Sequence, residues 1–294
     1  MRRTAKHTDN NPDSARAPTI LSAAGLTPSK SKGQNFLTQA AIADRIVAAA
    51  ELNSSDDVIE IGPGLGILSE RIVARDVRSL TLVELDRALA VRLREKFATD
   101  SCVAVIESDF LRADFRSLAK HSAKVIGNLP FNSAAAIFRM LCDHCDSIAL
   151  IVAMFQREVG ERLRARPHDS AYSALSVYAA LYFDIDLHFR VAAGSFHPKP
   201  KVDAEVLRFR RATNPLFAAD EEASVLETVR ASFSAPRKMI RNSLAGGLRI
   251  LARDAEAALS DARIAAAARA ESLSPADFVR LARALRDHAR TARS

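Results

Sequence analysis

Short apolar segments alternate with longer amphipathic ones through the first two thirds of the chain. The apolar segments have the length and near-continuous hydrophobicity of buried strands, and the segments between them repeat their apolar residues at helical spacing. This alternation predicts an open, doubly wound α/β sheet. The expected strands are residues 57–61, 79–83, 103–106, 123–126 and 148–154, the last running on into 155–159. The expected helices are residues 39–50, 67–74, 87–97 and 133–142.

The pattern changes beyond residue 211. Up to that point it predicts one more helix and two more strands, the second of which closes the sheet: residues 171–178, 185–191 and 206–209. After Asn214-Pro215 the chain carries Ala, Arg, Leu and Glu at helical spacing. The expected helices there are residues 221–233, 238–244, 254–259 and 275–288. We therefore expect three parts: a disordered N-terminal extension (1–28), an α/β domain (29–211) and a small all-α domain (212–294).

The first four expected strands are each followed by glycines or a polar side chain. Residues 62–66 (GPGLG) follow the first strand, and Glu84, Asp109 and Asn128 follow the next three. The carboxyl ends of parallel strands border the ligand crevice of such a sheet, so we expect these groups to share one site. Glycines let the backbone approach a ligand. Glu84 can accept hydrogen bonds from both hydroxyls of an adenosine ribose, and Asp109 can accept one from an adenine amine. The glycine turn by itself is equally typical of nicotinamide and flavin sites.

The turn Asn128-Leu129-Pro130-Phe131 has the groups needed to hold an adenine. The amide oxygen of Asn128 and the backbone carbonyl of Leu129 can accept hydrogen bonds from an exocyclic amine, and Phe131 offers a ring for stacking. The alternative interpretation is an ordinary strand-to-helix turn with a buried Phe.

Charge adds a candidate partner. Forty-two Lys and Arg against 35 Asp and Glu give a net charge of +7, which favours a polyanion such as RNA. Each cluster of cations can also be a solvated face of the protein. The clusters lie at residues 157–166, 199–201, 208–211 and 237–241.

Composition restricts the cellular location and the kinds of site that we expect for this protein. No run of eighteen apolar residues occurs and the N-terminus lacks the apolar segment of a secretory signal, so we expect no membrane span and a cytoplasmic protein. Three cysteines cannot form a disulfide framework. The C-x-x-C at 142–145 has no second pair of ligands for zinc, so we predict no metal.

Taken together, the motifs resemble those of the ribosomal RNA adenine dimethyltransferases, and among these the small-subunit enzymes. The resemblance covers about residues 30–288, and it rests on the order and spacing of the motifs. The motifs are KGQNFL (32–37), EIGPGLGIL (60–68), ELDR (84–87), NLPFN (128–132), FQREVGERL (155–163), YSALSV (172–177), PKPKVDAEV (198–206) and PRKMIRNSL (236–244).

The resemblance implies a class I, Rossmann-like methyltransferase domain that uses S-adenosyl-L-methionine, followed by a helical domain that helps to dock the ribosomal particle. The implied product is two adjacent dimethylated adenosines in the 3′-terminal hairpin loop of small-subunit (16S) rRNA. The implied partners are this RNA and the pre-30S particle, and we expect a monomer. By motif match, the cofactor residues are Asn35, Leu37, Gly62, Glu84, Asp109 and Asn128, and the catalytic turn is Asn128, Leu129, Pro130 and Phe131.

Two departures from the family pattern concern the target base. Phe131 stands where the family usually has Tyr, and residues 133–136 (SAAA) replace its usual Ile-Ser-Thr-Pro. Three alternative functions stay open: a large-subunit (23S) rRNA adenine methyltransferase that confers antibiotic resistance, a nicotinamide oxidoreductase, and a non-catalytic ribosome-assembly factor. The oxidoreductase leaves the Asn-Leu-Pro-Phe turn unexplained.

Overall fold

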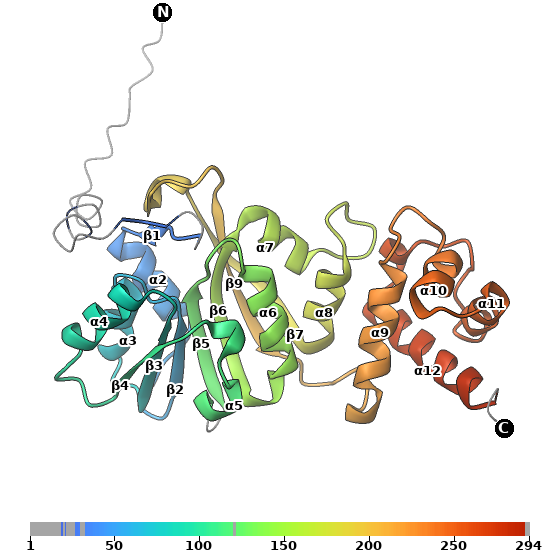
Figure 1. Cartoon of the computed structure of the whole chain (residues 1–294), viewed down its shortest axis with the longest axis horizontal. Helices are drawn as coiled ribbons and strands as arrows, with labels where there is room; N and C mark the ends of the chain where they lie inside the picture. The colour runs from blue at the N-terminus through green and yellow to red at the C-terminus, as the bar shows by residue number, and fades with distance from the viewer. Residues whose placement is uncertain (1–18, 20, 22–26, 30–32, 120–121, 292–294) are drawn as a thin grey trace, which may run out of the picture. The chain divides into compact units, whose positions relative to one another are not determined.

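The computed structural model describes residues 19, 21, 27–29, 33–119 and 122–291. The chain divides into two compact units (Figure 1): residues 1–160 with 187–209, and residues 161–186 with 210–294. The predicted disordered extension, residues 1–28, falls almost wholly outside the described residues.

A seven-stranded sheet carries the first unit. Across the sheet its strands are β4 (Val103–Glu107), β3 (Ser79–Glu84), β2 (Asp57–Ile61), β5 (Ala123–Asn128), β6 (Ile148–Gln156), β9 (Ala204–Arg211) and β7 (Phe183–Val191). The strands from β4 to β6 pair in parallel. The order reverses at β2, which lies between β3 and β5, and a reversal of this kind opens a ligand crevice at the carboxyl ends of the strands. The predicted doubly wound α/β fold is confirmed.

The strand bounds follow the apolar runs closely, because these strands are buried on both faces. β6, for example, has one exposed residue between Ile148 and Phe155. The position of one strand differs from the prediction. Residues 206–209 were expected to close the sheet, but β9 lies between β6 and β7, so β7 forms the edge.

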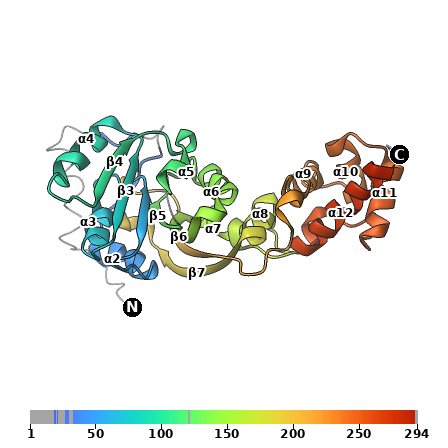
Figure 2. The ribbon, with the colours of Figure 1, turned by 90° about the horizontal axis from the view of Figure 1, so that it is seen from below.

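Helices cover both faces of the parallel strands (Figure 2), with α2 and α3 on one side and α5 and α6 on the other. Ile46, Ile72 and Leu93, from α2, α3 and α4, are buried in one apolar cluster against the sheet. On the other face the Phe138 ring of α6 packs on the ring of Phe209, with centroids 4.7 Å apart. The helices are α2 (Ala40–Ala49), α3 (Ile67–Val73), α4 (Arg87–Lys96), α5 (Phe115–Leu118) and α6 (Ala134–Asp143).

A separate two-stranded ribbon joins β1 (Phe36–Leu37) to β8 (Phe196–His197) in antiparallel register. The ribbon is extended by Thr38, whose backbone N–H and hydroxyl both donate to the Ser195 carbonyl, at 2.9 and 3.0 Å. The sequence pattern did not predict this pairing, because each strand is two residues long and the paired residues lie 159 and 161 positions apart along the chain.

The second unit is helical. Val229 of α9, Leu244 of α10, Leu259 of α11 and Phe278 of α12 are fully buried and form its core. The sequence predicted each of these helices. It did not predict α7, because residues 155–159 were expected to continue the strand. The helices are α7 (Arg157–Arg164, whose first turn lies in the first unit), α8 (Ala174–Tyr182), α9 (Glu222–Ser232), α10 (Ile240–Leu248), α11 (Ala252–Asp261) and α12 (Pro275–Thr291).

Among the described residues, no helix is both long enough and apolar enough to cross a membrane.

Candidate functional site

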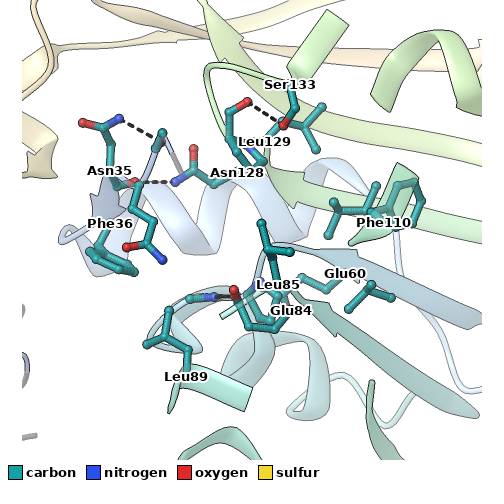
Figure 3. Close-up of a pocket in the computed structure, with 18 of the residues that line it drawn as sticks. Asn35, Phe36, Glu60, Glu84, Leu85, Leu89, Phe110, Asn128, Leu129 and Ser133 are labelled. Carbon is teal, nitrogen blue, oxygen red and sulfur yellow. Dashed lines mark hydrogen bonds between the residues drawn. The ribbon is translucent and has the colours of Figure 1, made fainter. Parts of the chain in front are cut away.

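One cavity opens at the carboxyl ends of the parallel strands (Figure 3). Its walls come from the ribbon strand β1, the glycine turn after β2, the ends of β3 and β4, and the turn after β5. The structure brings all the residues that the sequence singled out to this cavity: Asn35, Leu37, Gly62, Glu84, Asp109, Asn128, Leu129, Pro130 and Phe131. Their individual roles stay predictions.

Strand register accounts for this convergence. Ile61, the last residue of β2, pairs with Val83 on one side and Gly127 on the other. The next residues, Gly62, Glu84 and Asn128, therefore meet at one edge of the sheet. Gly62 and Gly64 have φ of +65° and +57°, a backbone conformation that side chains rarely allow, and this turns the chain sharply into α3.

Glu84 is buried and held by two backbone amides. The N–H of Gly64 donates to Oε2 at 3.0 Å, and the N–H of Asp86 donates to Oε1 at 2.9 Å. Burial raises the pKa of Glu84, and the two amide donors oppose that rise. Each carboxylate oxygen still has a free lone pair, so the group can accept the two hydroxyls of a ribose from a fixed position.

Asn128 has one amide atom bonded and the other unbonded. Its Nδ2 donates to the Asn35 carbonyl at 2.8 Å, as Figure 3 shows, which fixes the direction of the side chain. Its Oδ1 is buried and has no hydrogen-bond partner among the residues that the structure describes. A buried acceptor without a partner costs about 1–3 kcal/mol, so this oxygen is suited to a donor that arrives with a ligand.

The rest of the turn supplies an aromatic face. The Phe131 ring is half-buried and meets the edge of the Phe196 ring of β8, with centroids 6.2 Å apart. The Leu129 side chain is buried, which anchors the turn on the core. The backbone N–H of Ser133 donates to the Pro130 carbonyl at 3.0 Å, so the turn leads directly into α6. Phe131 therefore lines the same cavity as Asn128, on a turn that is fixed at both ends.

Asp109 lies at the end of β4 and is partly exposed. Its Oδ1 accepts from the N–H of Leu111 at 3.0 Å and caps the short 3₁₀ helix η1 (Phe110–Arg112). Oδ2 lies 3.9 Å from Nε of Arg112. The Asp109 carboxylate is thus oriented by its own loop, and it keeps lone pairs for a donor in the cavity.

The sequence reasoning missed Glu60, which also lines the cavity. Its side chain is 1% exposed, and the hydroxyl of Ser69 donates to its Oε2 at 2.6 Å. Burial raises the pKa of Glu60 to about 8, and the nearby charge of Glu84 adds to the rise. A signal was present, since a carboxylic acid between two isoleucines of a buried strand is rare without a partner or a function.

Within the part of the chain that the structure describes, no group of three or more His, Cys, Asp or Glu side chains is placed to hold a metal ion.

Comparison with known proteins agrees with the fold and the motifs. The family model for ribosomal RNA adenine dimethylase matches residues 26–287. The ribosomal RNA small subunit methyltransferase A of Syntrophotalea carbinolica is 39% identical over 263 residues, 89% of this chain and 98% of that protein. The protein of the same name from Magnetococcus marinus is 36% identical over 270 residues, 91% of this chain and 95% of that protein.

Two solved structures are similar over most of the chain. The 23S rRNA methyltransferase ErmE is 29% identical with a TM-score of 0.66, covering 86% of this chain and all of that one. A dimethyladenosine transferase from Plasmodium falciparum has the same fold, with a TM-score of 0.70 at 22% identity, covering 84% of this chain and 95% of that one. A family match over residues 26–287, with relatives aligned almost from end to end, shows that the chain belongs to the ribosomal RNA adenine dimethylase family.

Proposed function

We propose that the protein dimethylates the exocyclic amines of two adjacent adenosines in the 3′-terminal hairpin loop of small-subunit (16S) rRNA, using S-adenosyl-L-methionine, during small-subunit biogenesis. The observation that carries the proposal is the buried Oδ1 of Asn128, which has no partner among the described residues and belongs to the same cavity as Phe131. An acceptor and an aromatic face in one pocket suit a flipped adenine. The names of the relatives support the choice of the small-subunit RNA.

The cavity fits the cofactor that the family uses. Glu84 offers two acceptor oxygens for the ribose, Asp109 offers one for the adenine amine, and the glycine turn lets the backbone approach closely. Leu85 and Phe110 supply apolar walls. We assign cofactor contacts to Asn35, Leu37, Gly62, Glu84, Asp109 and Asn128. When bound, S-adenosyl-L-methionine supplies a methyl group made electrophilic by its sulfonium.

The protein's task is to make the adenine amine a better nucleophile. The lone pair of this nitrogen is delocalised into the ring. Asn128 Oδ1 and the Leu129 carbonyl would accept hydrogen bonds from its two N–H groups and favour a pyramidal nitrogen, with its lone pair directed at the methyl group. Phe131 would stack on the base and help to hold the reacting atoms about 3–3.5 Å apart. As the N–C bond formed, the bond between the sulfonium and the methyl carbon would break, and neutral S-adenosylhomocysteine would leave. The alkylated nitrogen would then be acidic and would lose its proton to water, so no side chain is needed as a general base.

The test is methyl transfer from labelled S-adenosyl-L-methionine to small subunits that lack adenine dimethylation, with large subunits in parallel. We expect dimethyladenosine only in the small-subunit RNA, identified by mass spectrometry. N128A should abolish the transfer while particle binding persists. N53A removes an exposed amide near the opposite ends of the strands and should leave the rate unchanged. Wild-type rates in N128A would show that this amide does not position the base.

A second candidate has a specific observation in its favour. ErmE, named for 23S rRNA, is 29% identical to this chain over all of its own length. Label confined to the large subunit would assign the protein to that branch. Label in neither subunit, despite cofactor binding, would leave a non-catalytic assembly factor as the better interpretation.

We also infer that the protein acts as a cytoplasmic monomer on a pre-30S particle. The net charge of +7 suits a particle with exposed RNA. Residues 29–211 would form the methyltransferase domain, and the helical residues 212–294 would help to dock the particle.

A further inference from the structure

Glu60 is a buried acid for which the reaction described above has no use. It lies on β2, two residues before the glycine turn, and lines the cavity together with Glu84 (Figure 3). The Ser69 hydroxyl of α3 is the one hydrogen-bond donor that the described residues offer to its carboxyl group. The carboxyl therefore keeps acceptor capacity that the described residues do not fill.

The surroundings of Glu60 disfavour a negative charge. On β3 the nearby titratable group is Glu84, another acid, and α3 contributes the neutral Ser69. The cation that acts on Glu60 is Lys96 of α4, but its Nζ lies 2.6 Å from Oε1 of Glu70 and donates to the Leu65 carbonyl. With its pKa raised to about 8, mainly by burial, Glu60 is mostly protonated at neutral pH while the cavity is empty.

Entry of a positive charge into the cavity reverses this balance. A cation within about 4–6 Å of a carboxyl group lowers its pKa by about 1–3, which takes Glu60 from mostly protonated to mostly ionised near pH 7. The ligand of the proposed function carries a sulfonium, an ammonium and one carboxylate, so its methionine end brings a net positive charge. Glu84 already accepts hydrogen bonds from two backbone amides, and the Asn128 amide carries no charge. Glu60 is therefore better placed than either residue to neutralise a positive charge in the cavity.

We propose that Glu60 carries a proton in the free protein and releases it to solvent when the cavity takes up the positively charged end of S-adenosyl-L-methionine, which its carboxylate then neutralises. This inference rests on the proposed function for the identity of the ligand. One O–H bond of the carboxylic acid breaks and the proton passes to the buffer. Cofactor binding is thereby coupled to pH, and binding weakens as the pH falls.

Calorimetric titration in buffers of different ionisation enthalpy counts the protons released. At pH 7 we expect the wild type to release close to one proton per S-adenosyl-L-methionine bound. Its Kd should rise roughly tenfold or more between pH 8.5 and 6.5. E60Q should bind the cofactor with little proton release and a much flatter pH dependence. The ligand's own amino group titrates near pH 8, so it can also take up or release protons on binding. The proton change measured with E60Q gives this contribution, which is subtracted from the wild-type value.

Matched variants and ligands identify the charged groups. E95Q neutralises an exposed acid on α4 and should release protons like the wild type. S69A keeps the acid but removes the donor that favours its ionised form, so it should bind more weakly and release less. S-adenosylhomocysteine has the ammonium but lacks the sulfonium charge, so proton release with this ligand would show that the ammonium is sufficient to ionise Glu60. Methylthioadenosine keeps the ribose and base without either charge and should release no proton.

The outcomes separate the two proposals. If the wild type does not bind S-adenosyl-L-methionine, the proposed function itself fails. Binding without proton release would overturn the role of Glu60 and leave the function standing. Release that persists in E60Q, or that methylthioadenosine also produces, would identify another acid, Glu84 above all, and would overturn the inference.

Discussion

At the scale of single residues, the most informative feature is that the two polar atoms of the Asn128 amide have different roles: one is bonded within the protein and the other is available to a ligand. Its nitrogen is bonded to the carbonyl of Asn35, 93 positions earlier in the chain, and its oxygen is left for the cavity. The sequence predicted the oxygen as an acceptor. It contained no sign of the partner that orients the side chain, because that partner is a backbone atom of a distant segment.

This difference between the two amide atoms predicts the effect of N128D. The variant keeps acceptor oxygens but places one of them against the Asn35 carbonyl, where a donor is now bonded. Loss of the hydrogen bond and the new repulsion cost about 1–3 kcal/mol, so the initial rate of methyl transfer should fall by roughly tenfold or more. A rate equal to that of the wild type would show that the Asn35 contact does not set the amide's direction.

Glu60 leads to a prediction about stability. Its pKa is about 8 in the folded state, against 4.5 in the unfolded chain. Folding therefore favours the protonated form, and the stabilisation present below pH 4.5 is lost as the pH rises to 8. Relative to E60Q, the free energy of unfolding of the wild type should fall by about 1 kcal/mol per pH unit across this range. Denaturant unfolding at pH 5, 6.5 and 8 measures the difference, and parallel curves for the two proteins would contradict the assignment.

At the scale of elements, the neighbouring glycines of α10 offer a matched pair. A Cβ on Gly247 would lie 2.7 Å from the Cα of Ala231 in α9, whereas a Cβ on Gly246 would meet nothing within 4 Å. G247A should force the two helices apart and destabilise the protein by about 1–3 kcal/mol. G246A should stabilise it by about 0.5–1 kcal/mol, because alanine loses less entropy in a helix. Thermal unfolding tests both, and equal midpoints would show that α9 and α10 are not packed this closely.

The elements also show which patterns a sequence can reveal. Strand β2, buried from Val58 to Ile61, was predicted to the residue, since a mostly apolar run between turns has few other interpretations. Helix α7 was missed because it follows β6 directly and is mostly Arg and Glu. The β1·β8 ribbon was missed because a two-residue strand has no periodicity. Short or strongly polar elements depend on tertiary contacts, so the hydrophobic pattern of the sequence does not predict them.

At the scale of the whole molecule, the excess positive charge matters where it is not already neutralised. Several cations are paired, such as Arg78 with Asp57 and Arg283 with Glu221. Lys199 and Lys201 are exposed, and no carboxylate of the described residues pairs with either. These two lysines are therefore available to phosphates.

This availability predicts the salt dependence of particle binding. Each lysine that contacts a phosphate contributes about one to the slope of log K against log salt, so K199A/K201A should reduce the slope by about 1–2. R75A removes an exposed cation at the opposite edge of the sheet and should leave the slope unchanged. Binding of the variants to small subunits at three salt concentrations makes the comparison. Equal slopes for all proteins would exclude these lysines from the RNA contact.

The bounds of the two compact units are set by tertiary contacts and differ from the boundary that the amino-acid composition predicted. The predicted boundary after residue 211 marks a change in amino-acid usage, whereas residues 161–186 group with the C-terminal helices. Within that unit the Tyr172 hydroxyl donates to the Leu273 carbonyl and the Tyr182 hydroxyl to Glu222. No local pattern shows that a helix ahead of three strands packs with helices that follow them.

The sequence by itself determined the strand–helix alternation, the glycine turn, and the polar groups at Glu84, Asp109 and Asn128, because these depend on local hydrophobicity and on residue type at strand ends. Only the tertiary structure decided which atoms of those groups stay available. In the folded chain the Asn128 nitrogen donates to the Asn35 carbonyl, just before β1, and Glu84 accepts from two backbone amides. Glu60 is buried and lines the same cavity as Glu84. Hydrogen-bond partners and burial are set by segments far apart in the chain, so they become fixed only when the sheet has assembled.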